Sequence, residues 1–209
     1  MRDMDVTRIG VLALQGAFAA HTARLRPLAV LPVEVRRVAE LSGLAGLVIP
    51  GGESTTLLNL MGDEPWFDAI ENFHAGGGAL LGTCAGAILL SREVVPSQPS
   101  LGLLDARIER NAFGRQVDSF ETTVEAPALG GSVDAVFIRA PRFRQLGPNV
   151  ITLAAFEGEP VLVQQGRVVA LTFHPELTRH GSVHAYFVAM ARQGKKAAAG
   201  ELVPAGRIP

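Results

Sequence analysis

The chain has 209 residues, of which 48% are hydrophobic and 19% charged, and its formal net charge is −1. This composition is typical of a globular protein and excludes a largely disordered chain, and the length suits one sizeable domain. The nearly neutral charge gives no electrostatic reason to expect a nucleic acid or an anionic membrane as partner.

Cysteine content and the N-terminal sequence favour a protein of the cytoplasm. The single cysteine, Cys84, cannot form an intrachain disulfide, so nothing argues for an oxidising compartment. The first apolar run, Ile9 to Leu14, is too short for a signal peptide or a membrane span.

The first half of the chain alternates short apolar runs with helical stretches. The run 9–14 predicts a strand buried on both faces, and further strands are predicted at 33–36, 44–49 and 79–82. A helical stretch follows Gln15-Gly16 to about Leu28, and others are predicted at 54–61 and 66–74. This order predicts a three-layer α/β fold, in which helices cover both faces of a mostly parallel sheet.

The second half is richer in strands. They are expected at 107–110, 121–125, 135–139, 151–156, 161–165 and 168–173. The segment 180–192 has the pattern of an amphipathic helix. Residues 193–209 mix Lys, Ala, Gly and Pro without an apolar face, which predicts a flexible tail after a single domain over residues 1–192.

Three loops follow predicted parallel strands, namely Gln15-Gly16, the loop 51–53 and the loop 83–85. In parallel sheets, sites lie beyond the carboxyl ends of the strands. We therefore expect these three loops to meet at one edge of the sheet.

The third loop carries Cys84, at the centre of the motif Gly82-Thr83-Cys84-Ala85-Gly86. The glycines permit the tight packing of a strand–turn–helix elbow. The N–H groups and the dipole at the start of the following helix favour the thiolate, which is the reactive form of cysteine. A buried structural cysteine is the alternative, but the glycines favour a nucleophile.

A cysteine nucleophile needs a base and a group that orients that base. Among the five histidines, only His174 directly follows a strongly apolar strand. Pro175 disfavours helical angles for His174, so Glu176, two residues on, is expected on the same side. Its carboxylate can accept the imidazole N–H and stabilise the imidazolium. The alternative is a histidine at a strand end with an exposed glutamate.

The other histidines carry weaker signals. His180 and His184 have the spacing of two metal ligands on one helical face, but no third ligand accompanies them, so surface histidines and no metal site are predicted. His21 and His74 lie within helical stretches and have no distinguishing context.

Acyl chemistry at Cys84 also needs N–H donors for the developing oxyanion. The N–H of Ala85 is one candidate. The second is expected from Gly51-Gly52, where the absence of side chains lets the backbone approach a substrate closely. A tight strand-to-helix turn with no catalytic role is the alternative for these glycines.

Together, these pieces resemble the class I (triad) glutamine amidotransferases. More closely, five segments are similar to the glutaminase subunits of pyridoxal 5′-phosphate synthases; they are residues 10–16, 50–56, 82–86, 110–120 and 173–178. Gly-Gly-Glu-Ser-Thr-Thr and Phe-Gly-Arg-Gln-Val-Asp-Ser-Phe are the most specific stretches. The resemblance covers about residues 9–190, and it departs at Ala112, where the family often has Ser.

The resemblance implies a flavodoxin-like fold, with Cys84 as nucleophile, His174 as general base and acid, and Glu176 as the group that orients His174. Gly52 and Ala85 would form the oxyanion hole. Glutamine would be bound by Gly52, Glu53, Ser54, Arg110, Ile138 and Arg139. An arginine suits this substrate because it can bind a carboxylate through two hydrogen bonds.

The resemblance also implies a partner and no cofactor. Free ammonia is mostly protonated in water, so such a glutaminase is expected to deliver it by a protected path to a synthase subunit. The isolated glutaminase would be weakly active, because the partner completes the oxyanion hole. Open alternatives are the glutaminase of another synthase, a cysteine hydrolase or peptidase, and a catalytically silent module.

Overall fold

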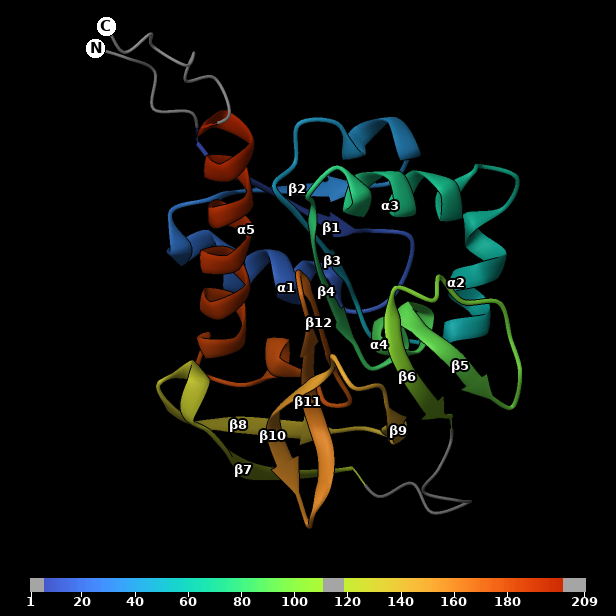
Figure 1. The fold of residues 1–209 in the computed structure, drawn as a ribbon, viewed down its shortest axis with the longest axis vertical. Helices are drawn as coiled ribbons and strands as arrows, with labels where there is room; N and C mark the ends of the chain where they lie inside the picture. Colours follow the sequence, from blue (N-terminus) through green and yellow to red (C-terminus); the bar gives the residue numbers. More distant parts are fainter. Residues whose placement is uncertain (1–5, 111–118, 201–209) are drawn as a thin grey trace, which may run out of the picture.

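A computed structural model describes residues 6–110 and 119–200, with the backbone alone for 195–200. A seven-stranded sheet in the order β10-β11-β12-β4-β3-β1-β2 forms its centre (Figure 1). Its strands are β1 (Arg8–Leu12), β2 (Leu31–Val35), β3 (Gly46–Ile49), β4 (Ala79–Thr83), β10 (Ile151–Phe156), β11 (Glu159–Gln165) and β12 (Val168–Leu171). The five strands from β12 to β2 are parallel, whereas β11 pairs antiparallel with both β10 and β12.

The helices cover both faces of this sheet (Figure 1). They are α1 (Phe18–Leu25), α2 (Ser54–Met61), α3 (Trp66–Ala75), α4 (Ala85–Leu90) and α5 (Ser182–Gly200). Short 3-10 turns are η1 (Arg26–Leu28), η2 (Val38–Leu41), η3 (Pro127–Leu129) and η4 (Pro175–Leu177). The predicted three-layer α/β fold is confirmed.

Alternation along each strand divides the apolar residues between two cores. In β4, Leu81 belongs to the core shared with α1 and α5, while Leu80 belongs to the core shared with α2, α3 and α4. In β3, Val48 faces the first core and Leu47 the second. Successive side chains of a strand point to opposite faces, so a strand covered on both sides must be apolar throughout.

Two smaller sheets complete the fold. One contains β5 (Ser91–Val95), β6 (Leu104–Glu109) and β9 (Arg142–Leu146), and the other pairs β7 (Phe120–Ala126) with β8 (Gly131–Phe137). The sequence did not predict β5 and β9, because both are short and only partly buried and therefore lack an apolar run.

The C-terminal helix is longer than predicted. α5 continues past Arg192 to Gly200, which takes up the first part of the expected tail, while residues 201–209 lie outside the described part of the chain. The segment 111–118, which holds most of the family-like block 110–120 and Ala112, also lies outside it. No helix among the described residues is long and apolar enough to cross a membrane.

Candidate active site

Cys84 occupies a strained turn between β4 and α4. Its backbone has φ 48° and ψ −103°, a left-handed conformation that is unusual for a residue with a side chain. Its N–H donates to the carbonyl of Leu171 in β12 at 2.8 Å, which holds the turn in place. A Cβ on Gly86 would lie 2.0 Å from the carbonyl oxygen of Ile49, so the turn requires glycine there. This is the geometry of a nucleophile elbow.

His174 and Glu176 lie together beside Cys84. His174 Nδ1 donates to Glu176 Oε1 at 2.8 Å, and the same imidazole lines one cavity with the Cys84 side chain. Glu176 is 2% exposed and His174 7%. The expected contact therefore exists, although Glu176 reaches His174 from the 3-10 turn η4 and not from an extended strand.

The electrostatics of the three residues favour a protonated His174. Burial lowers the pKa of His174, but hydrogen bonds to Cys84 and Glu176 and the charges of both outweigh it and raise the pKa from 6.5 to about 10. Burial raises the pKa of Glu176. The hydrogen bond from His174 and the charges of the nearby imidazoles outweigh this effect, so the pKa of Glu176 lies below its usual value. A carboxylate, an imidazolium and a cysteine thus lie together, an arrangement that favours reaction of the cysteine as a thiolate.

The loop Gly51-Gly52 packs directly against these residues. A Cβ on Gly51 would lie 2.5 Å from His174 Cε1 and 3.2 Å from Cys84 Cβ, so only glycine fits. Gly52 has φ 146° and lies over Gln15, whose Oε1 accepts from the N–H of Glu53 at 3.4 Å. The three loops that the sequence singled out therefore do meet at one edge of the sheet.

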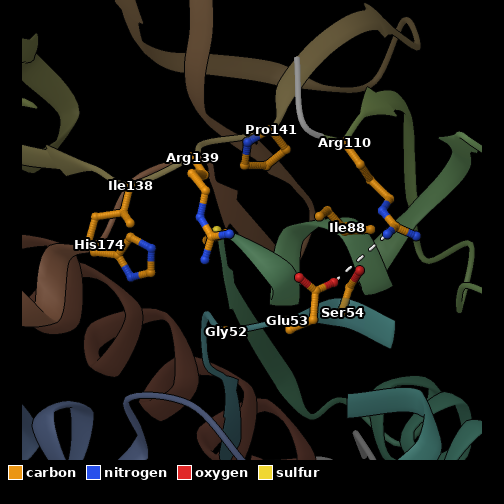
Figure 2. Close-up of a pocket in the computed structure, with 10 residues that line it drawn as sticks. Gly52, Glu53, Ser54, Ile88, Arg110, Ile138, Arg139, Pro141 and His174 are labelled. Atoms are coloured by element: carbon orange, nitrogen blue, oxygen red, sulfur yellow. Dashed lines mark ion pairs between the residues drawn. The ribbon is translucent and has the colours of Figure 1, made fainter. Parts of the chain in front are cut away.

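A cavity of about 130 Å³ opens at Cys84 and His174 (Figure 2). Ligand pockets for drug-sized molecules start at roughly 300 Å³, so this one suits a small metabolite. Its other lining residues are Gly52, Glu53, Ser54, Ile88, Arg110, Ile138, Arg139 and Pro141. All six residues expected to bind glutamine thus line one cavity, and the backbone of Ala85 adjoins it as the first residue of α4.

Arg110 is held at the wall of this cavity by groups from two segments. It donates to Gln98 Oε1, which also accepts from Ser54 Oγ at 2.9 Å. Glu53 Oε1 lies 3.9 Å from the guanidinium, the ion pair drawn in Figure 2. Arg139 projects into the same cavity from a left-handed backbone position, φ 43°.

Sequence reasoning missed several residues around the site. Ile88 and Pro141 line the cavity, and Gln98 positions Arg110, yet none stands in a motif that could have indicated a role. The prediction for His184 was wrong: it is 0% exposed, and so is His21, which it contacts. Helical periodicity did not show which face of α5 is covered by the sheet. His180 is exposed, as predicted.

A cysteine elbow with a His–Glu pair, at the edge of a mostly parallel sheet, is the arrangement expected of a triad-type glutamine amidotransferase. A model of the SNO glutamine amidotransferase family matches residues 11–193, and the chain belongs to this family.

Curated relatives match over nearly their whole length. The "pyridoxal 5′-phosphate synthase subunit PdxT" of Moorella thermoacetica is 50% identical over 185 residues, 88% of this chain and 98% of the relative. The proteins with the same description from Deinococcus radiodurans and Thermus thermophilus are 50% and 51% identical, each over 88% of this chain and over 96% and 97% of the relative.

Solved structures agree on the fold. A crystal structure described as a glutamine amidotransferase is 50% identical, with a TM-score of 0.83 over 88% of this chain and 98% of that chain. A chain in the structure of PurLQS from Thermotoga maritima is only 15% identical, yet it has a TM-score of 0.64 over 93% of this chain and 99% of that chain. The second match shows the shared fold alone.

Proposed function

We propose that this chain is the glutaminase subunit of a pyridoxal 5′-phosphate synthase, which hydrolyses L-glutamine to L-glutamate and ammonia and supplies the ammonia to the synthase subunit. Family membership and about 50% identity to PdxT relatives support this role in the complex. One observation supports the chemistry most directly: Cys84 and His174 line the same cavity as Arg110 and Arg139.

In the first half of the reaction, the Cys84 thiolate attacks the side-chain amide carbon of glutamine. The carbonyl electrons move to oxygen, and the N–H groups of Gly52 and Ala85 stabilise the oxyanion. When the tetrahedral intermediate collapses, the C–N bond breaks and the His174 imidazolium protonates the departing nitrogen, which leaves as ammonia. A thioester on Cys84 remains.

In the second half, His174, now neutral, takes a proton from a water molecule that attacks the thioester carbon. The C–S bond then breaks, the thiolate is restored beside protonated His174, and glutamate leaves. Glu176 stays ionised throughout and stabilises the imidazolium through its 2.8 Å hydrogen bond. No step of this mechanism uses a metal or an organic cofactor.

The wall of the cavity supplies groups for both charges of the substrate. The guanidinium groups of Arg110 and Arg139 suit the α-carboxylate, and the Glu53 carboxylate suits the α-ammonium. Ser54 adds a hydroxyl, while Ile138 and the backbone of Gly52 complete the contact surface. Gln98 keeps Arg110 in place through its side-chain oxygen. A cavity of about 130 Å³ fits one amino acid better than a peptide segment.

The partner follows from the chemistry of the product. Ammonia in bulk water is mostly the unreactive ammonium ion, so a synthase subunit must receive it directly. We propose that the domain over residues 1–192 docks on this subunit in the cytoplasm and gains activity there, since the partner completes the oxyanion hole.

The decisive experiment measures glutamate release by the chain with and without a pyridoxal 5′-phosphate synthase subunit. Strong stimulation is expected, and no stimulation would contradict the proposed place in that complex. In the same assay, Cys84→Ala is expected to abolish turnover while glutamine binding stays measurable. Full activity of this variant would overturn the role of Cys84.

A further inference from the structure

Two buried histidines lie behind the proposed triad, outside the cavity. His21 comes from α1 and His184 from α5, and the side chains of both are fully buried at 0% exposure. We call them the buried histidine pair. Neither lines the cavity, and the mechanism above uses neither. Buried ionisable side chains are rare unless a specific partner requires them.

The pair connects directly to the carboxylate of Glu176. His21 Nδ1 lies 2.9 Å from His184 Nε2, so a hydrogen bond joins the two rings. His21 Nε2 lies 3.4 Å from Glu176 Oε2 and 3.3 Å from Thr83 Oγ1. Glu176 therefore has a histidine at each oxygen, with His174 on Oε1 and His21 on Oε2.

Glu176 Oε2 has no hydrogen-bond partner among the described residues, and His21 Nε2, 3.4 Å away, hydrogen-bonds Thr83 Oγ1 in this structure. Hydrogen bonds in catalytic sites often tighten once substrate is in place. A buried carboxylate oxygen without a donor is unfavourable, and His21 Nε2 at 3.4 Å is placed to supply one after a small shift from Thr83.

Both histidines of the pair are neutral at neutral pH. Burial lowers the pKa of His21 to about 4, with the Glu176 charge opposing and the His174 charge adding to the effect. Burial likewise lowers the pKa of His184 to about 3; the charges of His21 and Arg24 add to it, and Glu176 opposes it. Each ring thus carries a single N–H, and its position decides what the pair can do.

The hydrogen-bond network assigns that N–H to Nε2 in both rings. In this arrangement His184 donates to His21 Nδ1, and the His21 N–H faces both Thr83 Oγ1 and Glu176 Oε2. Of the two rings, only the lone pair of His184 Nδ1 then has no partner among the described residues. In the opposite arrangement, a lone pair of His21 would face the carboxylate and a buried N–H of His184 would lack an acceptor. Within the described chain, the first arrangement leaves only the weak acceptor His184 Nδ1 without a donor. The second leaves a buried N–H without an acceptor and adds repulsion between the His21 lone pair and the Glu176 carboxylate.

We propose that His21, oriented by His184, is a positioning residue for the triad: its N–H holds the second oxygen of Glu176 and thereby keeps the first oxygen on His174. The chain of donors runs from His184 through His21 to Glu176, which accepts from both His21 and His174. The groups that face Glu176 are His21 from α1, His174 from the segment before η4, and Arg24, whose Nε donates to the Glu176 carbonyl at 3.2 Å. This role rests on the proposed triad but not on the identity of the substrate.

Alkylation of Cys84 by iodoacetamide tests the role directly, because the chain has no other cysteine and the reaction needs no glutamine. In His21→Leu, Glu176 loses its second donor and stabilises protonated His174 less. The pH profile of alkylation of the full chain is expected to move to higher pH, and the rate on its rising, low-pH side to fall about tenfold. His21→Gln, which keeps an N–H at the same reach, is expected to restore most of the rate.

The same variants are compared in glutamate release with the synthase subunit. His21→Leu is expected to lower kcat about tenfold and to leave KM unchanged, because His21 does not touch the cavity. His180→Leu serves as the matched control, since this histidine is 70% exposed and pairs only with Asp134 at 3.7 Å within the described chain; it should change neither measurement.

Three results would overturn the proposal: a wild-type alkylation profile in folded His21→Leu, an equal loss in His21→Gln, or an equal loss in His180→Leu. If His21→Leu does not fold, the double variant His21→Leu/His184→Leu replaces it, because it removes both ring systems together and leaves an apolar pair. Its alkylation profile must shift in the same direction. A chain that is alkylated as expected but never hydrolyses glutamine would refute the proposed function and leave this inference standing.

Discussion

Glu176→Gln removes the one negative charge that the proposed mechanism places behind the base. The carboxylate is buried and accepts the His174 N–H at 2.8 Å, so solvent screens the interaction little. A hydrogen bond to a charged group contributes about 1.5–3 kcal/mol, which corresponds to about a 10- to 150-fold effect on a rate. The glutamine amide adds a conflict, because its oxygen can accept from His174 only if its NH2 faces the His21 N–H.

We therefore expect kcat for glutamate release by the complex to fall about 100-fold in Glu176→Gln. The pKa of His174 should move from about 10 towards 6.5, which NMR titration can follow. Glu71→Gln, at an exposed position of α3, is the matched control and should leave both values unchanged. The reasoning fails if Glu176→Gln retains kcat within about twofold and the His174 pKa does not move.

The other predictions concern the cavity wall and acid stability. Gln98→Leu frees Arg110 and is expected to raise KM for glutamine about tenfold with a smaller change in kcat, measured by steady-state kinetics. Gly51→Ala places a methyl group 2.5 Å from His174 Cε1 and should reduce kcat at least about 100-fold, while circular dichroism shows a folded chain. The pKa values of the buried histidine pair are lowered from 6.5 to about 4 and 3. The pair therefore contributes its full stability above pH 6.5, and this contribution is lost as the pH falls from 6.5 towards 4. Replacing both histidines by Leu should reduce the pH dependence of the free energy of unfolding, measured from melting curves, by about 1.4 kcal/mol per pH unit for each histidine. An unchanged pH dependence would contradict the pKa values.

Much of the fold was predictable because it depends on patterns between neighbouring residues. Buried parallel strands such as β3 and β4 are continuous apolar runs, and the helices between them follow at regular intervals. β5 and β9 were not predicted, since one or two buried residues in a short strand give no recognisable period.

The proposed site was partly predictable for the same reason. The glycines around Cys84, and Pro175 between His174 and Glu176, constrain the backbone locally, so the sequence indicates where their side chains point. Gln98 carries no such constraint. It lies in the loop between β5 and β6, and its contacts with Arg110 and Ser54 exist only because the tertiary fold brings this loop to α2 and the end of β6.

The sequence alone indicated a parallel α/β sheet, a nucleophile elbow and the residues expected to surround it, because these depend on spacing within short segments. It left the partners of His21 and His184 open, and for His184 it predicted the wrong surroundings. These two residues are 163 positions apart, and they meet only when α1 and α5 pack on the same face of the sheet. Contacts of this kind are decided by how helices pack against a common core, which no local pattern records.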